Sequence, residues 1–543
     1  MCHKAMETQL SDTRGSIAFP EKVEFLVRIF VLAIGLMLLS RNIDSWFVGL
    51  REDNNAEFSV FARNHLYYGL GQTKLFNTWD NSLTLPAEPR RYLNRPPLIS
   101  LWIAIPMFVF GDHEWVCRMM PIAATLGSVW ILMVVISRLH SPILGLLTGL
   151  FYVMLPAIAY FGRIINYDPP VQFFSLLALH GYLQWTGLYG DGYNRKAGAL
   201  CYAFATVLGI GTGWTAAIMA WLIWLWHVCR VLRDRSLLRF LPLLTAIPIV
   251  SLAAVLVHIM WGSHWKFAWL GSLLLSRIVS PPVELVSWTK WFSLNWGYLI
   301  SNVSPFGIGA GIIYPGVVIA ILRYTASDSA FRQVVRSTAS AVPILLIGLQ
   351  GLIWVFVFKR QSAIHEFWQY VACPFFAVAM AGVIFSVFIL LSEYSFGFAA
   401  FAAFLLILAP IPLSARIVDS FYGLRYPLAE DTVAVFKKVA QLVEPRIPVM
   451  TSEEYAFPPG SDELFPEVAY YGNRPLIRTT DINEIEANSR GCAAYIMRAA
   501  NNPFMYKLAQ KLGEKYKLAG VERNYMIFLL NSPPQSNEKM LPK

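Results

Sequence analysis

The stretch from residue 143 to residue 161 reads ILGLLTGLFYVMLPAIAYF and contains no charged side chain. The stretches 25–40 (FLVRIFVLAIGLMLLS) and 399–413 (AAFAAFLLILAPIPL) are nearly as apolar, since Arg28 is their only charge. A lone helix inside lipid satisfies its backbone internally and needs no polar face. These stretches therefore predict transmembrane helices. No small-residue cleavage site follows the first one, so we expect it to be a retained anchor and not a signal peptide.

The composition of the whole chain is that of a membrane protein. Hydrophobic residues make up 56% of its 543 residues and charged residues only 14%, whereas soluble domains carry about 25% charged residues. The net charge of +10 comes mainly from short loops between apolar runs, which indicates positive-inside bias and no nucleic-acid partner. The six cysteines show no CxxC spacing, so neither a disulfide framework nor a zinc site is implied.

The apolar runs predict a polytopic α-helical protein with about eleven crossings. We place these crossings near residues 24–50, 118–137, 142–161, 170–189, 197–212, 213–229, 240–261, 306–322, 339–358, 366–390 and 394–414. Two shorter apolar stretches, 96–110 and 288–300, are predicted to be helices in the membrane interface, and their crossing would raise the count to about thirteen. A cytoplasmic N-terminus places the arginine-rich loops, including 230–239, on the inside.

The chain is predicted to contain two domains. Residues 1–415 form the transmembrane domain, whose first outer loop covers about 51–117 and includes the interfacial helix 96–110. From residue 416 charges and turn formers become frequent, so 416–543 is predicted to be a small soluble α/β domain facing outward. Its expected strands are 446–451, 493–497 and 524–530, and its expected helices are 432–443 and 503–516.

The first outer loop contains the strongest candidates for chemistry. Asp53 lies just beyond the first span and Glu57 follows one helical turn later, so both carboxylates fall on one helix face beside the bilayer. This spacing suits a general base. The alternative is a hydrated loop whose acidic groups only pair with Arg51 and Arg63. Glu52 points off the shared face, and we expect Glu52→Gln to matter little.

Several further motifs follow in order along the chain. They are Ala62-Arg63-Asn64, Tyr68-Gly69-Leu70, Arg95-Pro96-Pro97-Leu98, Phe110-Gly111, Glu114, Arg118, Arg163-Ile164-Ile165-Asn166-Tyr167-Asp168-Pro169-Pro170 and His365-Glu366-Phe367-Trp368-Gln369-Tyr370. Together with Asp53 they resemble the C-type (GT-C) membrane glycosyltransferases, in the branch of the protein O-mannosyltransferases and the bacterial lipid A aminoarabinose transferase. Taken alone, Asp168 also fits a helix cap, and the segment from His365 also fits an interfacial aromatic belt.

The resemblance implies an inverting transfer of a hexosyl or pentosyl group from a polyprenyl-phosphate donor to a lipid, glycan or protein acceptor. Asp53 would be the general base and Asp168 a second catalytic aspartate, and Glu57 joins them as a catalytic candidate because of its spacing from Asp53. The substrate-binding residues would be Arg63, Arg95, Arg163, Arg277, Lys359, Arg360, His365 and Glu366. No cofactor is fixed, and a divalent metal at Asp53 and Asp168 is left open. The enzyme would lie among the lipids of a bacterial inner or cell membrane, with its active site and C-terminal domain on the periplasmic or extracellular side.

The chain departs from the family pattern at two places. Gly211-Thr212-Gly213-Trp214 stands where the aminoarabinose transferase pattern has a lysine–glycine pair, and Asn54 stands where relatives often carry Glu. A multi-pass transporter and a non-catalytic membrane scaffold are the other classes considered. We find no repeat between the two halves and a long polar first loop, and both features count against a transporter. In a scaffold, the loops with Asp53 and Asp168 would have no reason to converge.

Overall fold

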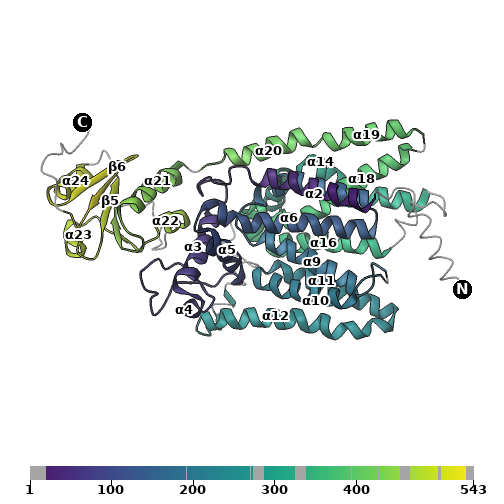
Figure 1. Ribbon diagram of the computed structural model, residues 1–543, viewed down its shortest axis with the longest axis horizontal. Helices are drawn as coiled ribbons and strands as arrows, with labels where there is room; N and C mark the ends of the chain where they lie inside the picture. The colour runs from purple at the N-terminus through teal and green to yellow at the C-terminus, as the bar shows by residue number, and fades with distance from the viewer. Residues whose placement is uncertain are drawn as a thin grey trace. The chain divides into compact units, whose positions relative to one another are not determined.

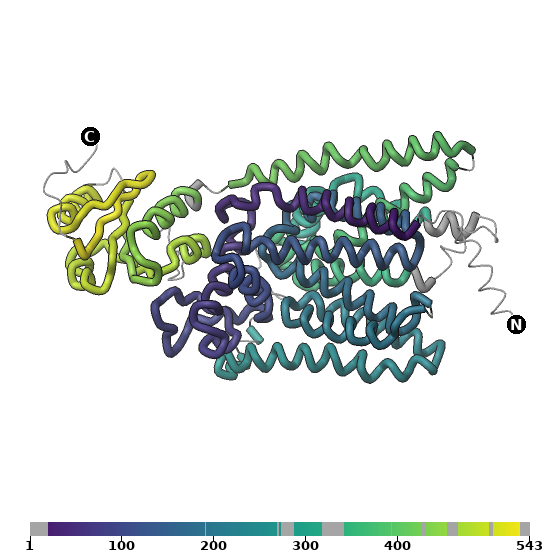
Figure 2. The backbone as a smooth tube through the Cα atoms, in the orientation of Figure 1, coloured from purple at the N-terminus to yellow at the C-terminus, as the bar shows by residue number. Residues whose placement is uncertain are grey.

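The computed structural model describes residues 20–532 except 191, 269–270, 273–286, 325–337, 393, 426, 453–464 and 499–502. The chain divides into two compact units. We call residues up to 43, 94–99 and 119–421 the bundle unit, and residues 44–93, 100–118 and 422 onward the loop–tail unit. Figure 2 traces the chain by colour through both of them. The first outer loop and the C-terminal tail thus belong to the same compact unit.

The bundle unit consists of helices, which confirms the predicted helical class. Its long helices are α2 (Glu21–Leu39), α6 (Glu114–Leu139), α7 (Pro142–Met154), α9 (Asp168–Trp185), α10 (Arg195–Thr212), α11 (Thr215–Arg233), α12 (Leu241–Gly262), α14 (Trp288–Tyr324), α16 (Thr338–Val357), α18 (Cys373–Ser392), α19 (Phe396–Leu408) and α20 (Ile411–Gly423). Short elements are α8 (Pro156–Phe161), η2 (Arg235–Phe240), α17 (Lys359–Ile364) and η4 (Glu366–Ala372). Figure 1 shows α9, α10, α11 and α12 packed side by side.

Among the described residues, five helical segments are long and apolar enough to cross a membrane. They are Glu114–Leu139, Thr215–Arg233, Arg235–Gly262, Glu366–Ser392 and Phe396–Gly423. Shorter apolar helices cover Leu98–Phe110, Pro142–Met154 and Ala341–Val357. The chain is therefore an integral membrane protein, while the predicted number of crossings stays a prediction.

Two predicted spans have different bounds in the structure. The span expected at 24–50 ends at Leu39, because the polar sequence from Ser40 forms turns and Asn42 adopts a positive φ of 53°. The span expected at 142–161 is divided at Leu155, because Pro156 has no N–H to continue the first helix and instead begins a second one. Local turn chemistry overrides the apolar pattern in both cases.

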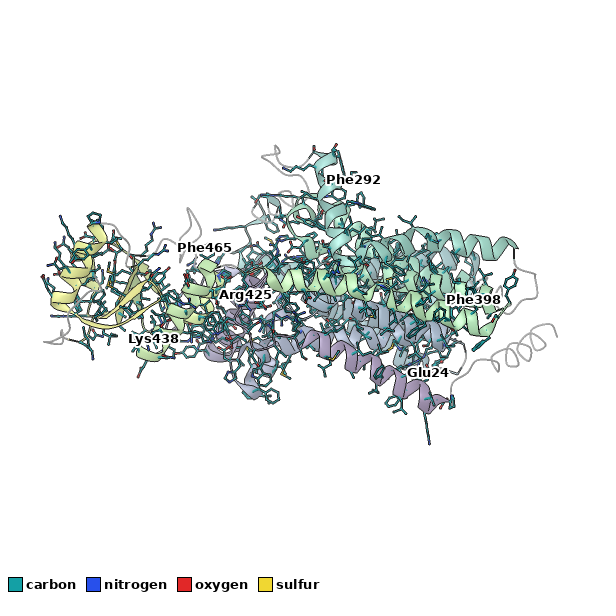
Figure 3. All side chains as sticks on the ribbon, turned by 90° about the horizontal axis from the view of Figure 1, so that it is seen from above. Glu24, Phe292, Phe398, Arg425, Lys438 and Phe465 are labelled. Carbon is teal, nitrogen blue, oxygen red and sulfur yellow. The ribbon has the colours of Figure 1, made fainter. Side chains whose placement is uncertain are left out.

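The stretch 288–300, predicted to lie in the interface, forms the first part of α14. Ser304 has φ 69° and ψ 156°, and this non-helical residue separates 288–303 from the rest of α14. Trp288, Phe292 and Trp296 recur every four residues and are all more than half exposed, at 56%, 53% and 53%. Figure 3 labels Phe292 on this helix. An exposed aromatic stripe of this kind is typical of the membrane–water interface.

Helices α9 and α10 meet through two glycines. A Cβ atom on Gly181 would lie 2.5 Å from the backbone nitrogen of Tyr202, and one on Gly198 would lie 2.5 Å from that of Trp185. Such distances are shorter than any real Cβ contact, so only glycine permits this approach of the two backbones. Close packing through small residues is a common basis of helix association in membranes.

We therefore expect Gly181→Val to separate α9 from α10 and to lower the melting temperature of the detergent-purified protein by several degrees, with a cost of about 1–3 kcal/mol for overpacking. The measurement is thermal unfolding followed by tryptophan fluorescence. Gly297→Ala is the matched control, because a Cβ at Gly297 meets nothing within 4 Å. Equal melting temperatures for the two variants would contradict the close approach at Gly181.

The loop–tail unit contains the predicted small α/β fold. Its sheet has the strand order β4-β3-β5-β7-β6, with β3 (Val449–Thr451) parallel to β4 (Leu476–Arg478) and β5 (Ala494–Arg498). β7 (Tyr525–Leu529) is antiparallel to β5 and β6 (Lys517–Glu522). The tail helices are α21 (Pro427–Leu442), α22 (Pro466–Gly472), α23 (Ile482–Asn488) and α24 (Pro503–Lys515). A buried apolar core including Met450, Tyr495, Leu512 and Phe528 holds β3, β5, β7 and α24 together.

The first outer loop supplies the remaining elements of this unit. They are α3 (Asp53–Tyr68), α4 (Leu70–Thr73), the two-residue strands β1 (Asn77–Thr78) and β2 (Arg91–Tyr92), and α5 (Leu98–Phe110). At about 1.5 Å per residue, α5 is about 20 Å long and too short to cross the roughly 30 Å of a hydrocarbon core. Its apolar residues Ile105, Phe108 and Val109 are exposed, as an interfacial helix requires.

Candidate active site

Helix α3 carries the two carboxylates that the sequence singled out. Asp53 is its first residue and is exposed, and Glu57 lies one turn further on and is half-buried. The i, i+4 spacing puts both on one face of the helix. A base that receives a proton from an incoming acceptor has to be accessible, and Asp53 meets that condition.

Glu52, the carboxylate expected to point off the shared face of Asp53 and Glu57, is buried and paired. Glu52 is only 2% exposed and accepts a hydrogen bond from Arg118 Nη2 at 2.7 Å. It also accepts bonds from the backbone N–H groups of Val48 and Gly49 at 3.2 and 3.0 Å. Arg118 is itself fully buried and donates to the carbonyl of Ser45 at 2.7 Å. This buried ion pair fixes the chain at the residue directly before Asp53.

A third carboxylate, Glu467 at the start of α22, lies within electrostatic reach of Asp53. Burial, together with the negative charges of Asp53 and Glu52, raises the pKa of Glu467 to about 7. Glu467 therefore binds a proton in a large fraction of molecules at neutral pH. The tail thus contributes an acid beside the exposed carboxylate of α3.

The C-terminal end of α3 is held by Arg446 from the tail. Arg446 is 3% exposed, donates to Tyr68 Oη at 2.8 Å and to Asn64 Oδ1 at 3.0 Å, and lies 3.5 Å from the ring centre of Tyr67. Its φ of 65° is unusual for an arginine, so these contacts hold a strained backbone in place. The tail is therefore a structural part of the unit that carries Asp53.

Arg63, a predicted substrate-binding residue, has partners inside the loop–tail unit. Its Nε donates to Asp112 Oδ2 at 2.6 Å and its Nη1 donates to the carbonyl of Tyr470 at 2.8 Å. The hydroxyl of Tyr470 donates to the other oxygen of Asp112 at 2.8 Å. Arg63 thus links α3 to α22, and a role with substrate stays a prediction.

His65 is the centre of a buried polar network in the same helix. Its Nδ1 lies 3.0 Å from Thr73 Oγ1, and its Nε2 lies 3.2 Å from Ser100 Oγ and 3.3 Å from Asn77 Oδ1. Burial lowers the pKa of His65 from 6.5 to about 4, so the ring is neutral at physiological pH. This network connects α3, α4, β1 and α5.

Because the folded pKa of His65 is lower than the unfolded one, the unfolded chain takes up a proton first as the pH falls. We therefore expect the loop–tail unit to lose stability between pH 6.5 and about 4, by on the order of 3 kcal/mol, and to level off below that range. Hydrogen exchange of α3 amides across this pH range measures the effect. His65→Gln should remove most of this dependence of stability on pH. If the dependence were unchanged in His65→Gln, other groups would be its cause.

In the bundle unit, Asp168 begins α9 and is only 2% exposed. Its Oδ2 accepts a hydrogen bond from Asn166 Nδ2 at 3.0 Å, and Arg95 is close enough for its positive charge to stabilise the carboxylate. The guanidinium of Arg95 lies 4.0 Å from the ring centre of Tyr167. Two motifs that are 73 residues apart in the chain, Arg95 and Asp168, thus form one cluster.

Aromatic rings connect this cluster to the late motif. Tyr167 lies edge-on to Trp354 at 6.5 Å between ring centres, and Trp354 stacks on Trp368 at 4.3 Å and 13°. His365 in turn stacks near Trp368 at 6.0 Å and 15°. The bundle unit therefore brings together Arg95, Asp168 and His365 from the three motifs.

The remaining predicted substrate-binding residues have other contacts, where the structure describes them. Arg163 is buried and donates a hydrogen bond to the carbonyl of Arg41. Lys359 Nζ lies 3.9 Å from the ring centre of Trp288, and the carbonyl of Glu366 accepts a hydrogen bond from Asn302. Arg360 adjoins Lys359 on α17. Arg277 lies outside the described residues. Among the residues described, no three His, Cys, Asp or Glu side chains form a ligand set for a metal.

An apolar cavity of about 660 Å³ lies between α14, α16 and the segment η4–α18 of the bundle unit. Its lining includes Trp291, Trp296, Leu349, Phe356, Gln369 and Phe375. Gln369 and Phe356 of the lining belong to η4 and α16, the same elements that carry Trp368 and Trp354 of the aromatic stack. The shape and lining suit a long hydrocarbon chain.

Sequence reasoning missed Glu467, Arg446, Tyr167 and Trp354 as site residues. Tyr167 directly precedes Asp168, and Trp354 is an aromatic residue on a predicted span, so position and residue type gave a weak signal for both. No local pattern distinguishes Glu467 or Arg446 from other charged residues of the tail. Their roles depend on contacts with residues several hundred positions earlier in the chain.

The apolar helical bundle with its small α/β tail has the same fold as solved membrane glycosyltransferases of the C-type (GT-C) class. ArnT from Cupriavidus metallidurans bound to undecaprenyl phosphate matches with a TM-score of 0.62 and 14% identity, over 93% of this chain and 99% of that one. The same ArnT in the apo state matches with a TM-score of 0.56 and 15% identity, over the same shares.

The archaeal oligosaccharyltransferase AglB from Archaeoglobus fulgidus, in complex with an inhibitory peptide and a dolichol-phosphate, also matches. Its TM-score is 0.56 and its identity 11%, over 91% of this chain and 72% of that one. No family model and no curated protein matches the chain. At these identities the likeness establishes the fold, and it confirms the resemblance that the motifs indicated.

Proposed function

We propose that this chain is a membrane glycosyltransferase that moves a sugar from a polyprenyl-phosphate-linked donor to an acceptor on the outer face of the membrane. The observation that carries the proposal is that one unit contains both the apolar cavity and the Arg95–Asp168 cluster, and that α16 and η4 contribute to the cavity and to the aromatic stack of the cluster. A polyprenyl phosphate needs both an apolar groove and a cation. The similar fold of ArnT, whose crystal structure contains undecaprenyl phosphate, supports the same donor class.

Each part of the donor has a matching region in the bundle unit. The prenyl chain occupies the cavity lined by Trp291, Leu349 and Phe375. The phosphate lies near Arg95, and Lys359 and Arg360 of α17 provide further positive charge. Asp168 lies at the sugar end, where the nearby positive charge of Arg95 favours its carboxylate form.

The chemistry is a direct displacement at the anomeric carbon. Asp53 takes the proton of the acceptor hydroxyl or amine while that group attacks, and Glu57 lies on the same face of α3. The bond between the anomeric carbon and the phosphate oxygen breaks, and polyprenyl phosphate leaves as an anion that arginine stabilises. Attack from the side opposite the phosphate inverts the anomeric configuration.

The test uses the full-length protein in nanodiscs with short-chain polyprenyl-phosphate hexose and pentose donors. We expect release of polyprenyl phosphate that depends on the protein, and new glycosylated products among lipid, glycan and peptide acceptors. Nucleotide sugars should not serve as donors. Release with a nucleotide sugar alone, or solute flux across sealed vesicles without release of polyprenyl phosphate, would refute the proposal in favour of another enzyme or a transporter.

The proposed outer location of the site gives a topological prediction. In a cysteine-free background, a cysteine at the exposed position Thr84 or Arg523 should react with an impermeant thiol reagent in intact cells or spheroplasts. A cysteine at Ser236, in the arginine-rich segment between α11 and α12, should react only after the membrane is opened. The reverse labelling pattern would place the site on the cytoplasmic side.

A further inference from the structure

A row of uncharged polar side chains continues from Asp168 into the bundle. Gln172 and Ser175 lie four and seven residues after Asp168, so all three share one face of α9. Gln350 of α16 donates from Nε2 to Ser175 Oγ at 2.8 Å and to the carbonyl of Thr215 at 3.1 Å. We call Asp168, Gln172, Ser175, Thr215 and Gln350 the polar seam.

The seam lies at the same end of the bundle as the donor cluster. Trp354, one turn after Gln350 on α16, contacts Tyr167, and Trp214 donates from Nε1 to the carbonyl of Asn94, next to Arg95. A Cβ on Gly213 would lie 2.7 Å from Val171 Cγ2, so the turn between α10 and α11 closely approaches α9. This is the turn where the lysine–glycine pair of the family pattern is missing.

Several polar atoms of the seam have no hydrogen-bond partner within the described part of the chain. They are Asp168 Oδ1, both amide atoms of Gln172, Thr215 Oγ1 and Gln350 Oε1, and the indole N–H of Trp354 is in the same state. All five residues are at most 2% exposed. A buried polar group without a partner costs about 1–3 kcal/mol, so this many of them beside one another indicates that a polar ligand completes their bonding.

The charges restrict what that ligand is. Gln172, Thr215 and Gln350 are neutral, and each amide or hydroxyl can both donate and accept, which suits sugar hydroxyl groups. The single carboxylate of the seam, Asp168, already interacts with Arg95. A carboxylate on the sugar would find no cation among the groups of the seam, and a protonated amine would have to share the carboxylate of Asp168 with Arg95, so either charge would be costly to bury.

We propose that the polar seam binds the hydroxyl groups of the transferred sugar and selects an uncharged sugar over amino sugars and uronic acids. This inference rests on the proposed glycosyltransferase function and specifies the substrate class of that site. Gln172 is the main specificity-determining residue, because its whole amide is available, and the indole N–H of Trp354 contributes one further donor.

The experiment measures kcat/KM of the full-length protein with short-chain polyprenyl-phosphate donors that carry a neutral hexose, an amino sugar or a uronic acid. The wild type should use the neutral donor best. Gln172→Leu and Gln350→Leu should each lower kcat/KM for the neutral donor about 10- to 100-fold, because hydrogen bonds from buried groups are lost. Gln172→Glu should shift the preference toward the amino sugar. Gln184→Leu, the same change near the other end of α9, should leave all rates unchanged.

A second measurement separates this inference from the proposed function. Thermal stabilisation of the protein by the neutral glycosylated donor should exceed stabilisation by bare polyprenyl phosphate, and Gln172→Leu should abolish only the difference. If no donor supports transfer, the proposed function fails. The difference in thermal stabilisation still shows whether the seam binds the sugar. If Gln172→Leu left both kcat/KM and the difference in thermal stabilisation unchanged, water would fill the seam and the inference would be overturned. A wild-type preference for a charged sugar would also overturn it.

Discussion

Replacing Asp53 with asparagine is expected to lower sugar transfer by at least about 10²-fold, the usual effect of removing a general base. The substitution keeps the size of the side chain and removes its ability to accept the acceptor's proton. Because Asp53 is the exposed first residue of α3, the change should leave folding and membrane insertion intact. Initial rates with a polyprenyl-phosphate donor, together with size-exclusion profiles of the purified protein, measure both properties.

A carboxylate-to-amide change elsewhere in the same loop provides the control. Glu88 is exposed and lies outside α3, so Glu88→Gln should transfer sugar at the wild-type rate. Asp168→Asn should also be impaired, because it removes the charge that Arg95 faces in the bundle unit. If Asp53→Asn transferred sugar as fast as Glu88→Gln, the assignment of Asp53 as the base would be wrong even though the fold is that of a glycosyltransferase.

Glu52→Gln is expected to destabilise the loop–tail unit by about 3–5 kcal/mol, the usual cost of removing one partner of a buried ion pair. Arg118 is fully buried, and the substitution would remove the negative charge that faces its guanidinium, while its hydrogen bonds to the main chain and hydroxyl of Ser45 carry no negative charge. Thermal unfolding and hydrogen exchange of α3 measure the loss. Transfer activity should fall as well, because Glu52 holds the residue that precedes Asp53.

The second partner gives a double-variant test. Glu52→Gln combined with Arg118→Met removes both charges, so the pair should recover much of the stability that Glu52→Gln loses. Arg523→Gln is the control, because its ion pair with Asp431 is exposed and 3.7 Å long and should cost at most about 1 kcal/mol. If Glu52→Gln were as stable as Arg523→Gln, the buried pair would not hold α3.

The candidate site shows which residues local patterns can and cannot assign. The prediction that Asp53 and Glu57 share one helix face agrees with the structure, because residues four apart lie on the same side of any α-helix. The buried pairing of Glu52 was not predicted, because its partner Arg118 lies 66 residues later in the chain. The substrate role expected of Arg63 stays a prediction, and its pairing with Asp112 was not predicted, since a positive charge in a loop gives no sign of its partner.

By itself, the sequence determined that this protein lies in a membrane and where most of its helices run, because a lipid-exposed span must satisfy its backbone within a single local segment. It also gave the strands β3, β5 and β7, whose apolar runs are buried in the tail core. Only the tertiary structure brought Arg95 and Asp168 together with the Trp354–Trp368 stack and placed Arg446 against α3. It also revealed which buried atoms of the polar seam have no hydrogen-bond partner within the described residues. Those features are contacts between segments distant in sequence, and no periodicity within one segment encodes its partner.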